Sequence, residues 1–395
     1  MRILLDMQGA QGANKDRGLG RYTVNFAQAL CRNRGKHEVF LALNDRFPDS
    51  VEKIRRDFEG LIPQENIRVW RAPNGVAYAG GNTWLRRAAE HIREAFLASL
   101  KPDIVHIGSL FEGFGDDVVT SIRSLQTKVQ TALTLYDLIP YVHPSIYLED
   151  RNIAKWYSEK VEVLREADLC LAISESSRQE GIRELGLCER SVINCSADAD
   201  AFFSRVEISD PERVLVRNRY QLGEHFILYT GGIDRRKNIE NLIIGYGAIS
   251  PALRRTHQLV IVCSVDDLSR RHFSALMHEN GLKKREVVFT GYLPDEELRT
   301  LYNICKLFVF PSWHEGFGLP VLEAMRCGAP VIGADTTSVA EIIGSNEAMF
   351  DPHDTSAISA KIEAALQDQE LRARLIKNGA SQEKKFSWDA TALSA

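Results

Sequence analysis

Short apolar runs alternate along the chain with longer stretches in which apolar residues recur at helical spacing. Such alternation is typical of repeated β-α units, in which buried parallel strands are joined by helices. In the first half of the chain the apolar runs predict strands over residues 3–5, 39–43, 67–70, 104–107, 131–135, 169–173 and 192–194. In the second half they predict strands over residues 226–229, 259–263, 287–289, 307–310 and 331–332. The expected fold class is therefore α/β with parallel sheets.

The alternation stops in a polar interval over residues 196–211 and begins again at about residue 225. A chain of 395 residues also exceeds the length at which one hydrophobic core keeps growing, so two domains are expected. We assign residues 1–205 to a first Rossmann-like domain, 206–380 to a second, and 381–395 to a C-terminal helix. Because open α/β domains bind ligands at the carboxyl ends of their strands, a cleft between the two sheets is the expected active site.

Composition narrows the class of protein. The net charge is only −4, with acidic and basic residues interspersed, so no global field favours nucleic acid as a partner. The seven cysteines are odd in number and form no Cys-x-x-Cys pair, which is typical of reduced thiols in a cytoplasmic protein. No apolar run approaches the roughly 18 residues that a membrane span needs. We therefore expect a cytoplasmic protein.

One predicted helix, over residues 84–100, is basic and amphipathic. A basic amphipathic helix can lie in a membrane interface, which leaves open a peripheral contact with the inner face of a membrane. The helix also precedes a predicted strand, as a crossover helix would, and we favour packing of its apolar face against the sheet. The apolar residues that share this face are Trp84, Leu85, Ala88, Ile92, Phe96 and Leu100, with Arg86, Arg87 and Arg93 elsewhere.

The most informative stretch is Glu-Gly-Phe-Gly-Leu-Pro-Val-Leu-Glu, from Glu315 to Glu323. It follows a buried apolar run, and Pro320 suits the first turn of a helix, so it predicts a strand, a glycine loop and a helix. Gly316 and Gly318 let the backbone approach a ligand, and the N–H groups of the new helix favour a phosphate or diphosphate. The two glutamates are better suited to accept hydrogen bonds from hydroxyls. A diphosphate together with hydroxyls describes a sugar nucleotide, which we favour over an ordinary helix with a solvated glutamate after a glycine turn.

The stretch closely resembles the signature of the retaining glycosyltransferases of family 4, which have the GT-B fold of two Rossmann-like domains facing across a cleft. The resemblance implies that Glu315 contacts the hydroxyls of the donor sugar as a catalytic residue, and that Glu323 contacts the ribose. It also implies that the glycine loop and the helix start meet the sugar and the phosphates. The end of the chain, with Phe386-Ser387-Trp388, resembles the family's C-terminal segment, which implies that the helix over residues 381–395 packs back on the first domain. The donor-binding residues of this stretch are then Gly316, Phe317, Gly318, Leu319, Val321 and Glu323.

A second polar group, Thr-Gly-Gly-Ile-Asp-Arg-Arg-Lys-Asn, follows the first strand of the second half. Gly231 and Gly232 allow a tight turn, and the consecutive cations can neutralise a diphosphate as it leaves. The family has a basic pair here that binds the donor diphosphate, which we map onto Arg236 and Lys237. Gly232 stands where many relatives have a further arginine, whose role Arg235 or Arg236 would have to take. The alternative, a solvated basic helix start, places cations where the helix dipole disfavours them.

The loop Arg-Gly-Leu-Gly-Arg-Tyr near the N-terminus carries Gly18 and Gly20. A dinucleotide site is disfavoured because Thr23 occupies the third glycine position and the loop after the first strand is too long. In GT-B enzymes the equivalent glycines touch the donor diphosphate, so the resemblance makes Gly18 and Gly20 donor-binding candidates. A plain turn into a helix is the alternative.

Three polar residues follow the predicted strand over 131–135: Tyr136, Asp137 and His143. They are expected at the carboxyl end of the sheet, where Asp137 would take part in catalysis and Tyr136 and His143 would bind the acceptor. Relatives usually have His-Asp where this chain has Tyr136-Asp137, so it is open which residue takes the role of the family's histidine. Asp137 as the cap of a turn and His143 as a structural residue remain alternatives.

The resemblance implies that the donor base lies beside Phe-Thr-Gly-Tyr-Leu-Pro over residues 289–294, lined by Tyr292 or Leu293. No Asp-x-Asp metal signature follows a strand of the second half, and Asp266-Asp267 predicts the start of a helix. We therefore expect no metal, and no cofactor besides the nucleotide-sugar donor.

Taken together, the motifs resemble bacterial mannosyltransferases that build surface polysaccharides such as lipopolysaccharide from GDP-mannose. The expected function is retaining transfer of a hexose, mannose from GDP-mannose, to a saccharide or lipid-linked saccharide acceptor. The same motifs fit a UDP-sugar donor. The alternative from another class is a non-catalytic subunit of a polysaccharide assembly complex that binds a sugar nucleotide or a glycan.

Overall fold

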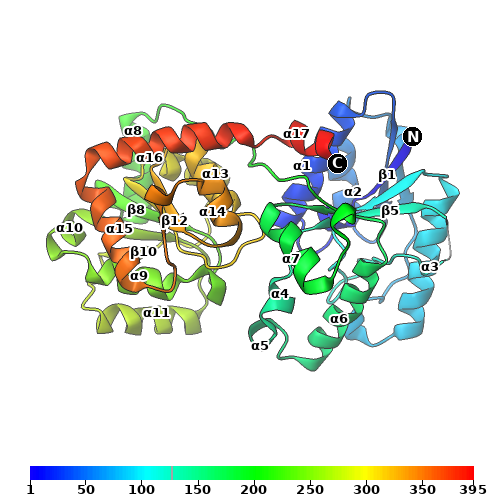
Figure 1. Ribbon diagram of the computed structural model, residues 1–395, viewed down its shortest axis with the longest axis horizontal. Helices are drawn as coiled ribbons and strands as arrows, with labels where there is room; N and C mark the ends of the chain where they lie inside the picture. Colours follow the sequence, from blue (N-terminus) through cyan, green and yellow to red (C-terminus); the bar gives the residue numbers. More distant parts are fainter. Residues whose placement is uncertain (126–127) are drawn as a thin grey trace. The chain divides into compact units, whose positions relative to one another are not determined.

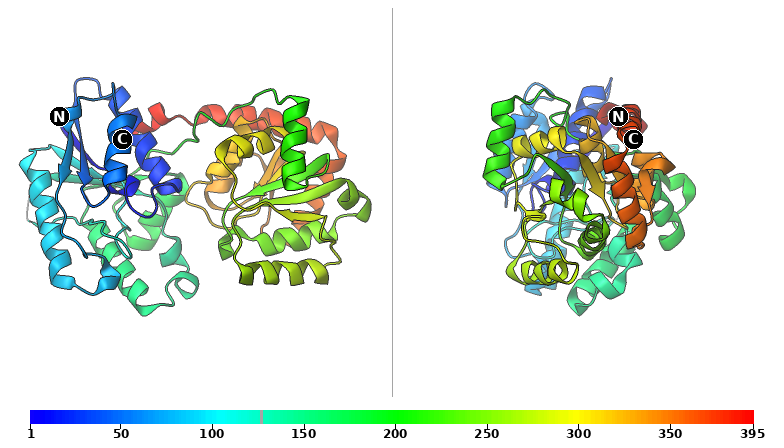
Figure 2. Two further views of the ribbon diagram at one scale, coloured as in Figure 1. Left: turned by 180° about the vertical axis from the view of Figure 1, so that it is seen from behind. Right: turned by 90° about the vertical axis from the view of Figure 1, so that its left-hand side faces the viewer.

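The structure is a computed structural model that describes residues 1–125 and 128–395. The chain divides into two compact units, one formed by Met1–Ala197 with Ser387–Ala395 and the other by Asp198–Phe386 (Figure 1). Each unit is built around a parallel sheet with helices on both of its faces (Figures 1 and 2). This is the doubly wound arrangement that alternating apolar runs and amphipathic stretches predict.

The first unit contains a seven-stranded sheet in the order β3-β2-β1-β4-β5-β6-β7. Its strands are β1 (Arg2–Asp6), β2 (Glu38–Asn44), β3 (Ile67–Trp70), β4 (Ile104–Ile107), β5 (Gln130–Leu135), β6 (Leu169–Ala172) and β7 (Val192–Asn194). Its helices are α1 (Gly18–Asn33), α2 (Pro48–Asp57), α3 (Thr83–Ser99), α4 (Ile139–Val142), α5 (Pro144–Tyr147), α6 (Arg151–Arg165), α7 (Glu175–Leu185) and α17 (Trp388–Ser394).

Successive residues of the strands supply two separate cores, one on each face of this sheet. Leu4 and Phe40 pack with residues of α3, α6 and α7, whereas Leu5 and Val39 pack with residues of α1 and α2. Because side chains alternate across a strand, both faces are apolar only when the run is continuous. The continuous apolar runs of the sequence therefore predicted these strands correctly.

Helix α3 packs on the sheet through Ala89 and Leu97, which are buried. Two residues assigned to its apolar face are exposed instead, Trp84 at 71% and Ile92 at 45%. Arg93, expected away from the apolar face, is 1% exposed and its Nη2 lies 2.5 Å from Asp6 Oδ2. The predicted face was thus wrong at Trp84, Ile92 and Arg93, because the buried ion pair turns Arg93 towards the sheet. Leu85, Phe96 and Leu100 pack on the core as predicted.

The second unit contains a six-stranded sheet in the order β10-β9-β8-β11-β12-β13. Its strands are β8 (His225–Thr230), β9 (His257–Val262), β10 (Val287–Phe289), β11 (Leu307–Phe310), β12 (Val331–Ala334) and β13 (Met349–Phe350). Its helices are α8 (Asp210–Tyr220), α9 (Ile239–Ala248), α10 (Pro251–Thr256), α11 (Asp267–Glu279), α12 (Asp295–Ile304), α13 (Leu319–Arg326), α14 (Thr337–Ile343), α15 (Thr355–Gln367) and α16 (Gln369–Gln382). Strand β13 was not predicted, because two residues are too short for an apolar run to be recognised.

The division between the units lies after Ala197, eight residues before the position expected at 205. The residues that follow are fastened to the second unit, where Arg326 Nη2 lies 2.6 Å from Asp198 Oδ1 and Arg326 Nη1 donates to the Ala199 carbonyl. The C-terminal division lies after Phe386, where 380 was expected. Helix α17 packs beside α1, and the ring of Trp388 meets the edge of Tyr22 (Figure 1).

In each sheet the strand order reverses between two central strands, β1 and β4 in the first unit and β8 and β11 in the second. Loops that leave the carboxyl ends of such strands diverge to opposite faces, which is where open α/β sheets bind ligands. The loops after β8 and β11 are those that carry the basic turn and the two-glutamate stretch.

Among the described residues, no helix has both the length and the apolar character to cross a membrane. Six of the cysteines are buried, whereas Cys188 is exposed.

Candidate functional site

A carboxylate and two cations meet where β8 and β11 end. Glu315 Oε2 lies 2.6 Å from Arg236 Nη1, and Glu315 Oε1 lies 2.5 Å from Lys237 Nζ. The Glu315 side chain is 8% exposed, and those of Arg236 and Lys237 are 21% and 13% exposed. The structure therefore brings together three of the residues predicted to be catalytic, which lie almost 80 positions apart in the chain.

The charge of Glu315 is fixed by these neighbours. Burial alone would raise the pKa of the carboxyl group, but the Lys237 and Arg236 charges and their hydrogen bonds lower it to about 2. The hydroxyl of Ser312, 2.6 Å from Oε1, adds a further hydrogen bond to the ionised form. Glu315 is consequently an acceptor of hydrogen bonds at neutral pH and has no proton to give.

The two loops that carry this cluster are bonded to each other. Asn238, with a left-handed φ of 61°, donates from Nδ2 to the carbonyls of Pro311 (3.0 Å) and Pro352 (2.6 Å). Arg236 Nη1 donates to the His314 carbonyl, and the Trp313 N–H donates to the Arg236 carbonyl, each over 3.0 Å. These bonds hold the basic turn against the glutamate loop, so the cluster is organised before any ligand arrives.

The loop ends at a glycine that begins helix α13. Gly318 has a φ of 111°, a region that favours glycine because it lacks a Cβ. As the N-cap of α13 it has no side chain to bond the first helical turn, and Pro320 stands inside that turn as predicted. The positive end of the helix is thus left for an anionic ligand. The neighbouring Phe317 ring packs edge-on against Phe386, so its side chain belongs to the core of the unit.

The second glutamate of the stretch is held by a tyrosine that the sequence did not single out. Tyr302 donates from its hydroxyl to Glu323 Oε2 over 3.0 Å and lies 2.9 Å from the hydroxyl of Thr230, at the end of β8. Burial, followed by the Glu323 charge, raises the pKa of Tyr302 well above its usual value, so its hydroxyl keeps the proton. The two residues lie on α12 and α13, and no spacing in the sequence indicates that they meet.

The remaining donor candidates of the second unit differ in exposure. Tyr292 is 75% exposed, whereas Leu293 is buried, so of the two only Tyr292 presents its side chain at the surface. Gly231 and Gly232 lie in the turn after β8, where the Tyr229 hydroxyl donates to the Gly232 carbonyl over 3.0 Å. Leu319 and Val321 belong to the first turn of α13.

In the first unit, the structure joins Tyr136 to the glycine loop. The Tyr136 hydroxyl lies 2.9 Å from the Gly108 carbonyl and 3.3 Å from the Leu19 carbonyl, so it ties the end of β5 to the start of α1. Gly18 begins this helix. A Cβ on Gly20 would lie 2.0 Å from the Lys15 carbonyl oxygen, so only glycine fits there.

Asp137 and His143 lie around the short helix α4. Asp137 Oδ1 accepts from the Ile139 N–H over 3.1 Å, which is the turn-capping contact named above as the alternative to catalysis. His143 is partly buried between α4 and α5. Among residues 1–125 and 128–395, no group of three or more His, Cys, Asp or Glu side chains is close enough together to hold a metal ion.

Comparison with known proteins decides the family. Residues 17–200 match the family described as Glycosyltransferase Family 4, and residues 215–382 match Glycosyl transferases group 1. Over 386 residues the chain is 35% identical to O-antigen chain mannosyltransferase B of Escherichia coli, covering 94% of this chain and 93% of that protein. The chain belongs to glycosyltransferase family 4. The predicted family is therefore confirmed.

This glycosyltransferase is also similar to a longer protein. It is 36% identical over 394 residues to the serotype-specific mannosyltransferase WbdA of Escherichia coli, covering 99% of this chain and 47% of WbdA. The chain thus spans about half the length of that relative.

Solved structures show the fold of the glycosyltransferase. Sucrose-phosphate synthase from Thermosynechococcus elongatus aligns with a TM-score of 0.71 at 21% identity, covering 100% of this chain and 96% of that one. WaaG, a glycosyltransferase involved in lipopolysaccharide biosynthesis, aligns with a TM-score of 0.66 at 14% identity, covering 100% and 98%. The predicted GT-B fold class is confirmed.

Proposed function

We propose that this glycosyltransferase is a retaining mannosyltransferase that moves mannose from GDP-mannose to a saccharide or lipid-linked saccharide in the synthesis of a bacterial surface polysaccharide. The names of the relatives from Escherichia coli support mannose as the transferred sugar and an O-antigen as the class of product. The geometry of the second unit supports a sugar-nucleotide donor.

The observation that carries the proposal is the buried cluster of Glu315, Arg236 and Lys237. Two cations beside the start of α13 form a positively charged cradle that suits a diphosphate. An ionised carboxylate in the same cradle would repel a bare phosphate, but it accepts hydrogen bonds from the hydroxyls of a sugar attached to that diphosphate. The cluster therefore suits the two halves of a nucleotide sugar.

The reaction breaks the bond between the sugar C1 and the diphosphate oxygen, and the electron pair leaves with the nucleoside diphosphate. Arg236, Lys237 and the N-terminal turn of α13 stabilise the negative charge that develops on the leaving group. An acceptor hydroxyl approaches C1 on the face from which the diphosphate departs and gives its proton to the leaving phosphate oxygen. Because the leaving phosphate takes this proton, no protein group needs to act as a base. Because the acceptor enters on the face that the diphosphate leaves, the new C1–O bond has the configuration of the old one.

The other residues orient the substrates. Glu315 holds the sugar hydroxyls, Glu323 holds the ribose, and Tyr292 lies beside the base. Gly18 and Gly20 bring backbone N–H groups to the diphosphate.

On the acceptor side we assign Asp137 a catalytic role and His143 contact with the acceptor. Because the Tyr136 hydroxyl already donates to Gly108, this residue acts by fixing the segment that carries Asp137.

The test is transfer itself. The protein is incubated with GDP-mannose and a mannose oligosaccharide, and the products are read by mass spectrometry. The proposal predicts products heavier by one or more hexoses, which depend on GDP-mannose. Transfer from a UDP-sugar that equals or exceeds transfer from GDP-mannose would contradict GDP-mannose as the donor. Absence of transfer from a panel of GDP- and UDP-sugars, with donor binding intact, would favour the non-catalytic binding subunit.

A further inference from the structure

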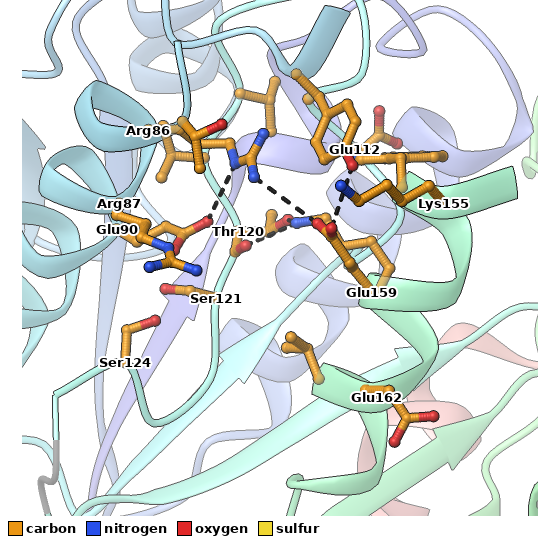
Figure 3. Close-up of a pocket in the computed structure, with 18 residues that line it drawn as sticks. Arg86, Arg87, Glu90, Glu112, Thr120, Ser121, Ser124, Lys155, Glu159 and Glu162 are labelled. Atoms are coloured by element: carbon orange, nitrogen blue, oxygen red, sulfur yellow. Dashed lines mark hydrogen bonds and ion pairs between the residues drawn. The ribbon is translucent and has the colours of Figure 1, made fainter. Parts of the chain in front are cut away.

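A polar cavity of about 500 Å³ lies in the first unit between α3, α6 and the segment over residues 112–121 (Figure 3). Its volume falls in the range of small-molecule sites, roughly 300–1,000 Å³. None of the described residues that line it is among the donor, acceptor or catalytic residues assigned above. We propose that this cavity binds a neutral saccharide, and that it holds sugar units of the acceptor chain other than the one that reacts. The second part of this proposal rests on the proposed function.

The charges that line the cavity exclude an ionic ligand. Four of its described lining residues are cations, Arg86, Arg87, Lys155 and Lys160. Four are carboxylates, Glu90, Glu112, Glu159 and Glu162. A site for an anion or a cation would have an excess of the opposite charge. Balanced charge with many donors and acceptors instead suits a neutral ligand that carries many hydroxyls.

Two of the carboxylates, Glu90 and Glu159, are held in place by a cation yet retain capacity for a ligand. Arg86 lies between Glu90 and Glu159, at 3.8 Å and 3.7 Å from their oxygens (Figure 3). The Tyr78 hydroxyl also donates to Glu159 over 3.2 Å. Each carboxylate has about four acceptor positions, so one or two protein contacts leave others for sugar hydroxyls.

Aromatic rings form one side of the cavity. Tyr78 and Trp156 line it, and Phe114 stacks on Tyr78 and meets Trp156 edge-on, at ring-centroid distances of 6.1 Å and 5.4 Å. Arg86 already lies over the Tyr78 ring, with its guanidinium carbon 4.2 Å from the ring centroid. Trp156 is therefore the lining ring that suits a pyranose, since it combines an apolar face for the C–H groups with a polar edge for the hydroxyls.

The segment over residues 112–121 is held in place by hydrogen bonds from two helices. Lys160 Nζ donates to the Thr120 carbonyl over 2.7 Å and to its hydroxyl over 2.6 Å, which joins α6 to the segment. Arg93 Nη1 donates to the Ser121 carbonyl over 3.0 Å, and the Ser121 hydroxyl donates to Glu94 over 2.7 Å, which joins it to α3. A preformed site loses little conformational entropy on binding, which is needed for a weakly held neutral sugar.

The test measures binding without any donor. A mannose tetrasaccharide is titrated into the whole protein and followed by saturation-transfer NMR. Thr83→Trp places a bulky ring at an exposed lining position of α3 and is expected to lower the affinity at least about tenfold. Ala95→Trp adds the same ring at an exposed position of α3 outside the cavity and should bind as the wild type. Glu90→Gln, which keeps the size of the side chain, is expected to lower the affinity about three- to tenfold.

Three results would overturn the proposal: no binding by the wild type, equal affinity of the Thr83→Trp and Ala95→Trp variants, or displacement of the tetrasaccharide by inorganic phosphate. Transfer of mannose to a short acceptor is measured separately on the wild type. Failure of that transfer contradicts the proposed function, whereas loss of tetrasaccharide binding contradicts the cavity alone.

Discussion

Glu315 and Lys237 form a buried ion pair in which Nζ and Oε1 are 2.5 Å apart, and Arg236 neutralises the second carboxylate oxygen at 2.6 Å. The cations proposed to receive the diphosphate are therefore already engaged with the residue proposed to receive the sugar. When the donor binds, its phosphates must share these cations with Glu315. On the proposed roles, the pair couples recognition of the sugar to recognition of the leaving group.

Substitution of Glu315 by Gln should separate turnover from nucleotide binding. The variant loses the charged acceptor for the sugar hydroxyls, so we expect the rate of transfer to fall at least about 100-fold. It also frees Arg236 and Lys237, so the affinity for GDP should stay within a few-fold of the wild type or increase. Rates and a GDP titration are measured side by side, with Glu279→Gln on the exposed surface of α11 as the control. Equal loss of rate and affinity would contradict the assigned role.

Substitution of Lys237 by Met should weaken binding of the diphosphate. We expect the dissociation constant for GDP to rise about 10- to 100-fold, because one charge-assisted hydrogen bond donor in a buried site is lost. Lys377→Met is the matched control, since Lys377 is an exposed lysine on helix α16 to which no role in donor binding is assigned. If the two variants bind GDP equally well, Lys237 is not a diphosphate ligand.

The low pKa of Glu315 has a consequence for stability in acid. The folded-state pKa of about 2 lies below the ordinary value of 4.5, so the unfolded chain takes up a proton more readily. The ion pairs therefore contribute to the free energy of unfolding above about pH 4.5, and this contribution is lost as the pH falls towards about 2. Glu315→Gln has no such titration. The difference in unfolding free energy between wild type and variant, measured by denaturant titration, should therefore shrink from about pH 5 to about pH 2.5. A difference that stays constant over this range would show that the ion pairs of Glu315 make no pH-dependent contribution to the unfolding free energy.

Substitution of Tyr302 by Phe should act on the nucleoside through Glu323. Without the donated hydrogen bond, Glu323 is less well oriented, and we expect KM for the donor to rise about five- to twentyfold with little change in kcat. The variant should also lose discrimination between GDP and 2′,3′-dideoxy-GDP. Tyr246→Phe removes another buried hydroxyl, which bonds to the His257 carbonyl, and serves as the control for stability. If Tyr302→Phe still discriminates between GDP and 2′,3′-dideoxy-GDP as the wild type does, the proposed contact of Glu323 with the ribose is contradicted.

The strands could be predicted from the sequence because buried parallel strands need continuous apolar runs, and these are visible locally. Pairs between distant residues could not. Arg93 was placed away from the core because its partner Asp6 lies 87 positions earlier, and Tyr302 gave no sign of meeting Glu323. The start of the second unit was expected too late for the same reason, since Asp198 pairs with Arg326, 128 positions on.

Within the site, the glutamate stretch and the basic turn were recognisable because glycines, proline and charges follow apolar strands at a fixed spacing. That Glu315 binds both cations directly was not predicted, because the two loops are adjacent only once β8 pairs with β11. The cavity in the first unit escaped notice for a related reason. Its lining residues come from three separate segments, none of which carries a motif.

The most direct test of the central claim is the anomeric configuration of the product, observed by NMR while the protein acts on GDP-α-mannose and a mannose acceptor. The account predicts a new α-mannosidic anomeric signal that grows with the release of GDP in the wild type and is nearly absent with Glu315→Gln. A β-mannosidic product, or an α-product formed equally fast by Glu315→Gln, would contradict it.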